Sequence, residues 1–459
     1  MKKVFILSIV LFAAACSSMP EYRRPEVKTP DSWLEGKAAP APDLANWWQK
    51  FNSPELAALE EKALKQNFTL RAALARVEQA RATAKITGAA LSPQAALSGS
   101  LSGTTQKTGG GSSTYAPTGG GGVNISYELD LFGGNRAARA AAQAGVASSL
   151  YDREALALVV SSEVAKTYAR ALALNGRIHI ARNNRKNMVK TLDILKARFK
   201  EGLGTVLEIE LQKTGIANAD AGIATLENSR AVTMHALAVL VGESPQGFSI
   251  SADSLGDLTL PVIAPGQPSA LLERRPDIRK AEADLVAANA NIGVARAAFF
   301  PSVNLGLAPS IAVSPLSSPA TSALQIASAI SVPLFNGGSL KAGLEKSQAR
   351  ERELAENYRH TVLTAFQEVE AALTGARSAL RRQGSYTRAL LSSDKAYKMV
   401  GTMFREGAID YMTMLESERS LLSAKDNLVS ANLDRLAAAI DLYKAVGGGW
   451  QGGLENEKH

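Results

Sequence analysis

Alternation of apolar and polar residues predicts β-strands in this chain. In "PSVNLGLAPSIAV" (301–313) and "VNISYELDL" (123–131), every second residue is apolar over most of the stretch, with small or polar residues between. The segments that complete each region alternate less regularly. A two-residue period places successive side chains on opposite faces of a sheet. We therefore expect four strands in two hairpins, at about 93–131 and about 302–334.

Each hairpin is expected to follow one helix and to precede a much longer one. The first helix begins near Ser53-Pro54, because serine caps a helix and proline suits its first position, and it runs to about Leu91. The later copy begins at Pro276 and ends at Pro301. At 1.5 Å per residue, a helix of some 65 residues spans on the order of 100 Å. That length suits a tube across a wide aqueous compartment better than a globular domain. The long helices are expected at 134–200 and 338–405, with antiparallel partners at 206–242 and 411–446.

Similar segments recur about 205 residues apart. "YELDLFGG" contains Phe132, and "ISVPLFNGGSL" contains Phe335, 203 positions later. "RFKEG" from Arg198 corresponds to "MFREG" from Met403, and "LRAALARVEQARATAK" corresponds to "IRKAEADLVAANANIG". We interpret the chain as two tandem copies of one supersecondary unit.

The second face of the expected strands carries small and polar residues, none large enough to fill a protein core. This pattern favours a barrel whose lumen faces water; a soluble sheet with one wet face is the alternative. Four strands cannot close a barrel, and two chains would supply eight, whose side chains nearly fill the interior. Three chains would supply twelve, which leaves a pore. We therefore expect a membrane β-barrel of twelve strands, closed by a homotrimer.

The N-terminus has the three parts of a secretory signal peptide: two lysines, an apolar run and three alanines before Cys16. Cys16 is the single cysteine and resembles a lipoprotein processing site, although Ala13 stands where leucine is usual. We expect Cys16 to be acylated; ordinary signal cleavage beside an incidental cysteine is the alternative. The expected organisation is a signal peptide (1–15), a lipidated extended segment (16–53), a first repeat (54–247), a linker (248–275), a second repeat (276–449) and a C-terminal tail (450–459).

Composition excludes several classes of function. The formal net charge of +8 is modest for 459 residues, and no basic run is interleaved with aromatic residues, so we expect no nucleic-acid partner. Four scattered histidines and one cysteine offer no metal-ligand spacing. No catalytic constellation stands out. We therefore expect no enzyme activity, no cofactor and no metal. After the leader, no apolar stretch reaches the 18 residues of a transmembrane helix.

The segment "LLERRPDIRKAEADLVAANANIGVARAAFFPSVNLGL" (271–307) resembles the TolC-like outer-membrane efflux factors, in their lipoprotein branch (the OprM/NodT type). "YELDLFGG", "WWQKFNSPELAALEEKAL" and "DLYKAVGGG" also fit, so the resemblance covers 22–449. It implies a trimeric outer-membrane β-barrel continued by a periplasmic α-helical barrel. It also implies the exit duct of a tripartite efflux pump. The implied partners are a periplasmic adaptor, an inner-membrane transporter, expected to be proton-driven, and outer-membrane lipid. The implied location is the outer membrane of a Gram-negative bacterium, with a lipid anchor and an extension into the periplasm.

The resemblance also implies a periplasmic gate. Met412, Glu416 and Arg419 fall at i, i+4 and i+7, on one helical face just after the second turn between long helices. The matching positions in the family lie at the constricted aperture, with aspartate where Glu416 stands. Glu418 replaces a residue that is usually neutral in the family, so either acid is a candidate for the lumen. A solvated i,i+3 ion pair is the alternative interpretation.

The two turns between long helices are the expected docking surface for the adaptor's helical hairpin. The candidate contact residues are Arg198, Lys200, Gly202, Arg405, Gly407 and Asp410. Turn chemistry alone also accounts for the glycines, and Asp410 is equally a turn or cap residue. "RRPDI" (274–278) is charged, but proline and aspartate at a helix start are ordinary terminus chemistry.

We expect the chain to be a passive exit duct for drugs or other small toxic compounds. One alternative is the exit duct of a type I secretion or metal-export system. Another, of a different class, is a lipid-anchored periplasmic coiled-coil protein with a structural role, which would lack the strand alternation. The eight methionines form no stripe that would favour copper or silver. The sequence does not identify the cargo.

Overall fold

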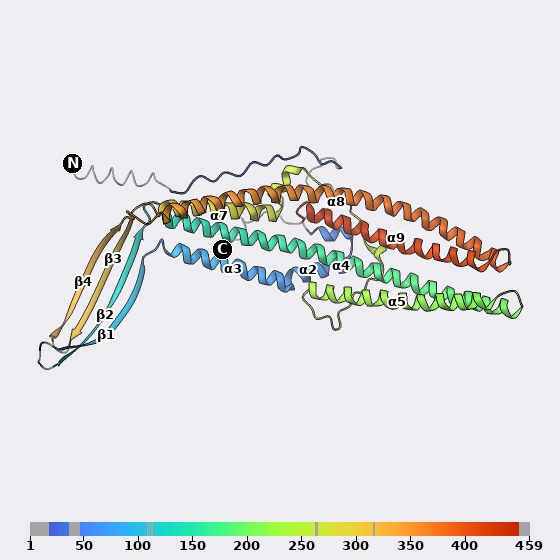
Figure 1. The fold of residues 1–459 in the computed structure, drawn as a ribbon, viewed down its shortest axis with the longest axis horizontal. Coiled ribbons are helices and arrows are strands. Elements are labelled where there is room, and N and C mark those ends of the chain that lie inside the picture. Colours follow the sequence, from blue (N-terminus) through green and yellow to red (C-terminus); the bar gives the residue numbers. More distant parts are fainter. Residues whose placement is uncertain are drawn as a thin grey trace. The chain divides into compact units, whose positions relative to one another are not determined.

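The computed structural model (Figure 1) describes residues 18–448, except 36–45, 108, 110, 112, 262–264, 315 and 316. The expected signal peptide, Cys16 and the C-terminal tail lie outside these residues. The described residues fall into two compact units. One contains 18–27, 75–151 and 279–361. The other contains 28–74, 152–278 and 362–448.

The first unit contains one antiparallel sheet of four strands in the order β1-β2-β3-β4 (Figure 1). The four strands lie within the two regions expected from the alternating pattern. β2 also pairs with β3, with Tyr127 opposite Leu305, so the two hairpins form a continuous surface. The strands are β1 (Gln94–Lys107), β2 (Ser113–Leu129), β3 (Ser302–Ser314) and β4 (Ser317–Ser331).

The two faces of the sheet differ in chemistry. Residues directly opposite in the register share a face, and Leu97 lies opposite Val123, Ile125 opposite Leu307, and Leu307 opposite Ile326. These side chains form an apolar face that is open to solvent in the single chain: Leu97 is 83% exposed and Ile326 77%. The other face carries residues such as Ser98, Asn124, Ser126, Gly306 and Ala327. The expected apolar and small-polar alternation is thus present across all four strands.

The helices repeat with equal lengths in the two halves of the chain. The helix before each hairpin has 22 residues, the long helix after it has 67, and its partner has 35. At 1.5 Å per residue the longest helices span about 100 Å. This confirms the duplicated unit. Within the described residues, none of the helices has both the length and the apolar character needed to cross a membrane. The helices are α3 (Phe68–Ala89), α4 (Gly134–Lys200) and α5 (Val206–Leu240), then α7 (Pro276–Ala297), α8 (Ser339–Arg405) and α9 (Tyr411–Ala445).

The first helix differs from its prediction. A single helix was expected from Pro54 to about Leu91, but the chain forms α2 (Pro54–Gln66) and α3 with a break at Asn67. The side-chain oxygen of Asn67 accepts hydrogen bonds from the backbone N–H groups of Thr69 and Leu70, and its amide donates to the carbonyl of Leu240 at 2.8 Å. Asn67 therefore starts a new helix and ties it to the end of α5. Ser53 caps α2 as expected.

The N-terminal segment runs along α7 in the first unit. Residues 18–30 have no regular secondary structure. Arg24 forms a two-bond ion pair with Glu282 at 2.7 and 2.9 Å, and the Asn289 amide donates to the carbonyl of Pro20. Gly293 permits this close approach, because a Cβ there would lie 2.8 Å from the Cα of Met19.

The core of the second unit is aromatic. Trp47 lies in the short helix η1 (Trp47–Phe51), is fully buried, and stacks on Tyr443 of α9 with ring centroids 5.1 Å apart. Phe51 packs edge-on against Trp47. In the described residues of the stretch between the repeats, the chain forms three short helices: η2 (Leu255–Asp257), η3 (Pro268–Ala270) and α6 (Leu271–Arg274).

Candidate functional site

Two glycine turns join the long helices to their partners. Gly202 lies just after the end of α4 and Gly407 just after the end of α8, with φ angles of +73° and +76°. The backbone N–H of Leu203 donates to the carbonyl of Arg198 at 2.8 Å, and that of Ala408 donates to Met403 at 2.9 Å. Both turns are therefore the same helix-ending motif, in which a left-handed residue reverses the chain and glycine is favoured. We call them the first tip (198–205) and the second tip (405–410).

The charged residues of the tips have different surroundings. The Arg198 guanidinium donates to the carbonyl of Phe404 at 2.8 Å and lies 4.8 Å from the centroid of that ring, so it joins the first tip to α8. Lys200 and Arg405 are exposed. Asp410 caps α9, because its carboxylate accepts from the N–H of Thr413 at 2.7 Å. This bond lowers the pKa of the Asp410 carboxyl. Turn and cap chemistry thus accounts for part of the predicted docking set.

An apolar cluster behind the tips holds α9 against α4, α5 and α8. Its buried members are Leu195, Ile209, Phe404, Tyr411, Met414 and Leu415. The Tyr411 hydroxyl donates to the side-chain carbonyl of Gln212 at 2.6 Å, and the Gln212 amide donates to the carbonyl of Met188 at 2.7 Å. Burial raises the pKa of Tyr411 to about 12, so the phenol stays neutral.

The three predicted gate residues lie together on one exposed face of α9. Met412 is 56% exposed, and Glu416 and Arg419 are exposed as well. With Ser392 and Ala396 of α8 they line a groove of about 760 Å³. Within the described part of the chain, neither Glu416 nor Arg419 has an ion-pair partner. In a single chain their charges are thus available for contacts with another molecule.

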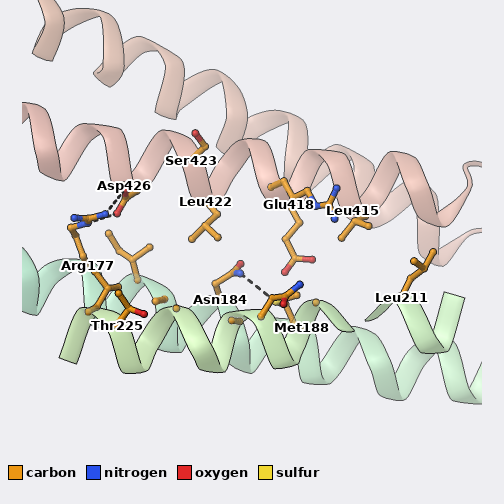
Figure 2. Close-up of a pocket in the computed structure, with 18 residues that line it drawn as sticks. Arg177, Asn184, Met188, Leu211, Thr225, Leu415, Glu418, Leu422, Ser423 and Asp426 are labelled. Atoms are coloured by element: carbon orange, nitrogen blue, oxygen red, sulfur yellow. Dashed lines mark hydrogen bonds and ion pairs between the residues drawn. The ribbon is translucent and has the colours of Figure 1, made fainter. Parts of the chain in front are cut away.

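Glu418 lies on a different side of the same helix. Only 4% of it is exposed, and its Oε1 atom is buried without a hydrogen-bond partner among the described residues. It points into a second cavity between α4, α5 and α9 (Figure 2). Sequence reasoning left open which of the two acids faces the lumen. In the single chain Glu416 is the acid that is exposed to solvent, and a position of either acid at the lumen stays a prediction.

Comparison with known proteins places these features in a family. The family model described as "Outer membrane efflux protein" matches residues 59–243 and 267–448. The chain belongs to this family of outer-membrane efflux proteins. The two matched stretches correspond to the two structural copies.

The efflux protein has relatives along nearly its whole length. It is 35% identical to the pyoverdine export outer membrane protein OpmQ of Pseudomonas aeruginosa, with 98% of each chain covered. It is 32% identical to the cation efflux system protein CusC of Escherichia coli, covering 98% of this chain and 99% of CusC. Its structure is similar to the open state of the MtrE outer membrane channel of Neisseria gonorrhoeae, with a TM-score of 0.85 and 29% identity over 95% and 99% of the two chains.

These findings confirm the expected family, fold class and location. The efflux protein is an outer-membrane channel of a Gram-negative bacterium that extends into the periplasm, with a four-stranded sheet and long helical hairpins in each chain. The family is one of channels. Among the described residues, no group of three or more His, Cys, Asp and Glu side chains is arranged to hold a metal ion.

Proposed function

We propose that the efflux protein is the passive exit duct of a tripartite pump for small toxic compounds. The sheet is the observation that carries this proposal, because one face is apolar and the other is small and polar. An apolar face suits lipid, and a polar face suits a water-filled lumen. The relatives are named for export of pyoverdine and of cations.

The test is complementation of a strain that lacks its own channel of this type. Expression should restore growth in sublethal concentrations of lipophilic antibiotics, together with a matching adaptor and transporter. Restored tolerance to copper or silver alone would favour metal export instead. Failure to restore either, with the protein present in the outer membrane, would contradict the proposal.

Three copies are proposed to form the channel. Among the described residues, β1 and β4 each pair with one neighbouring strand, so each has a free edge there. Free edges are avoided in stable sheets, and joining three copies edge to edge gives a closed barrel of twelve strands. Native mass spectrometry of the protein in detergent should show a trimer; monomers or dimers alone would exclude this assembly.

Met412, Glu416 and Arg419 are proposed to close the periplasmic end as a threefold ring. Their exposure on one face of α9 and the unpaired charges support this role. Exposed ion pairs contribute roughly 0.2–1 kcal/mol each, so three between subunits would bias a hinge by about 1–3 kcal/mol. Glu416→Ala with Arg419→Ala should raise single-channel conductance in planar bilayers, and high salt should partly mimic it.

A matched control exists in the first repeat. Glu210 and Lys213 form an exposed i,i+3 ion pair at 2.8 Å on α5. Glu210→Ala with Lys213→Ala removes the same charges from the corresponding hairpin and should leave conductance unchanged. Equal conductance of the gate variant and wild type at every salt concentration would show that the gate lies elsewhere.

The adaptor is proposed to dock at the two tips. Lys200 and Arg405 supply exposed charge there, and Gly202 and Gly407 set the turns. Arg198 acts within the chain, where it holds the first tip against Phe404. Lys200→Glu with Arg405→Glu should weaken co-purification of the adaptor, while Arg198→Ala should mainly loosen the tips. An unchanged yield of adaptor with the double variant would exclude this surface.

A lipid anchor at Cys16 is also proposed, from its position after three alanines. Wild type should incorporate labelled palmitate and Cys16→Ser should not. Absence of label in wild type would remove the anchor while leaving the channel proposal intact.

A further inference from the structure

A cavity of about 700 Å³ lies within the second unit, between α4, α5 and α9 (Figure 2). It adjoins the exposed groove around Met412, because Leu415 and Arg419 line both. Much of its wall is apolar, with Met188, Leu211, Leu226, Leu415 and Leu422 among the lining residues. This volume and the combination of apolar walls with polar and charged groups suit a small organic molecule.

Glu418 lines this cavity, and the hydrogen bonding of its carboxylate is incomplete. Figure 2 shows its side chain pointing from α9 across the space toward Met188 on α4. Its Oε1 atom has no hydrogen-bond partner among the described residues, and the residue is 96% buried. A buried carboxylate without a donor is unfavourable, so a ligand that supplies an N–H donor and a positive charge would be stabilised there.

Several of the neighbouring polar groups are already engaged. Arg177 forms a two-bond ion pair with Asp426, at 2.6 and 3.0 Å, at one end of the cavity. The Tyr411 hydroxyl donates to Gln212 instead of Glu418. Arg419 also lines the cavity but is exposed, and no ion pair joins it to Glu418 in the described chain. The protein itself therefore leaves Glu418 without a counter-ion.

We propose that this cavity binds a monovalent organic cation, a protonated amine on an apolar body, with Glu418 as its counter-ion. One carboxylate matches one positive charge, and the leucine and methionine side chains contact the apolar body. A divalent metal ion does not fit, because it would require several carboxylate or imidazole ligands and the lining supplies one unengaged acid. An anion does not fit either, because the buried charge is negative.

Binding of this kind depends on pH. Burial raises the pKa of the Glu418 carboxyl to about 7, and the cation binds the ionised form. Burial also raises the pKa of Tyr397 and Tyr411, so these phenols remain uncharged near neutral pH. Affinity should therefore rise as pH increases through 7. The titratable and charged groups around Glu418 are Arg177 on α4, Glu208 on α5, Tyr397 on α8, and Tyr411, Arg419 and Asp426 on α9.

The test uses 9-aminoacridine, a fluorescent fused-ring cation, with the full-length protein in lipid nanodiscs. We expect saturable binding at pH 8 and about tenfold weaker binding at pH 6, because only about a tenth of Glu418 is ionised there. Glu418→Gln should weaken binding at pH 8 by about tenfold or more and should abolish the pH dependence. Acridine, the uncharged ring analogue at pH 8, should bind weakly and equally to both proteins.

Two further variants keep the test decisive. Glu210→Gln removes an exposed acid of α5 that does not line the cavity, and it should leave binding unchanged. Gly222→Leu should block the cavity with Glu418 intact, because a Cβ at Gly222 meets nothing within 4 Å and leucine favours a helix. Absence of saturable binding, or equal affinity of wild type and Glu418→Gln at pH 8, would overturn the proposal. Neither outcome depends on whether the protein complements an efflux-deficient strain.

Discussion

Arg275 offers a sharp test of what holds the second unit together. It precedes α7 and is 93% buried. Its guanidinium donates to both carboxylate oxygens of Asp277, at 3.0 and 2.6 Å, and to the carbonyl of Ala445 at 2.9 Å. Its Nη2 atom also lies 2.7 Å from a carboxylate oxygen of Glu368. One side chain therefore joins the start of α7, the middle of α8 and the end of α9.

Replacing Arg275 with methionine should be costly, because it removes the positive charge and leaves the acids behind. Burial by itself lowers the pKa of a guanidinium, yet the hydrogen bonds and charges of Asp277 and Glu368 raise that of Arg275 above its ordinary value. The network therefore favours the charged form strongly. Breaking a buried ion pair by removing one partner costs about 3–5 kcal/mol. The side chains of Asp277 and Glu368 are 38% and 45% exposed, so solvent screens the charges left behind and the expected cost lies at the lower end of that range. A loss of about 3 kcal/mol corresponds to roughly 100-fold faster hydrogen exchange through local opening.

Hydrogen exchange followed by mass spectrometry measures the loss of local stability in peptides from the start of α7 and the end of α9. Arg275→Met should accelerate exchange there and leave the tips unchanged. The exposed Arg296→Met on the same helix is the control and should have no such effect. Adding Asp277→Asn and Glu368→Gln to Arg275→Met should restore part of the protection, since neither acid is then left without its cationic partner. Exchange of Arg275→Met within about threefold of wild type would refute the reasoning.

Other predictions concern stability at particular residues. The folded pKa of Glu418, about 7, exceeds its ordinary 4.5, so Glu418 destabilises the fold increasingly as pH rises from 4.5 to 7. Glu418→Gln should therefore stabilise by about 3 kcal/mol at pH 8 and by little at pH 4, and thermal unfolding with the same gap at both values would contradict this. Gly242→Ala should destabilise by about 1–3 kcal/mol, because φ is +80° and a Cβ would lie 2.6 Å from the Gln66 carbonyl oxygen; an unchanged melting temperature would exclude that strain. Thr205→Ala should cost about 1 kcal/mol by removing the capping box with Glu208, seen as faster exchange in the first turn of α5.

The regular elements were predictable because they follow from periodicity and from turn residues. The long helices were expected at 134–200 and 338–405, and they occupy Gly134–Lys200 and Ser339–Arg405. Glycines at 202 and 407 marked their ends correctly, since both adopt positive φ. The strands were predicted from a two-residue period of apolar positions, which is the pattern of a sheet whose two faces differ in chemistry.

Features that depend on tertiary contacts were not predictable from the sequence. Asn67 breaks the first helix because it bonds the carbonyl of Leu240, a partner 173 residues away. The hydrogen bond of Arg198 to the carbonyl of Phe404 joins residues of different repeats, and its predicted role at the docking surface stays a prediction. The burial of Glu418 also depends on helices distant in sequence. A local pattern contains no information about these partners.

The internal repeat helps to separate residues that fold the chain from residues with another role. Both tips use a glycine with positive φ and a side-chain cap on the following helix, Thr205 in one copy and Asp410 in the other, so these features serve the hairpin itself. At the equivalent offset of 205, exposed Leu211 corresponds to Glu416, and exposed Lys213 corresponds to buried Glu418. The backbone of a 35-residue helix forms equally well with either set. Glu416 and Glu418 are therefore not needed to form the hairpin. This supports the proposals of a gate at Glu416 and of a ligand-binding site at Glu418.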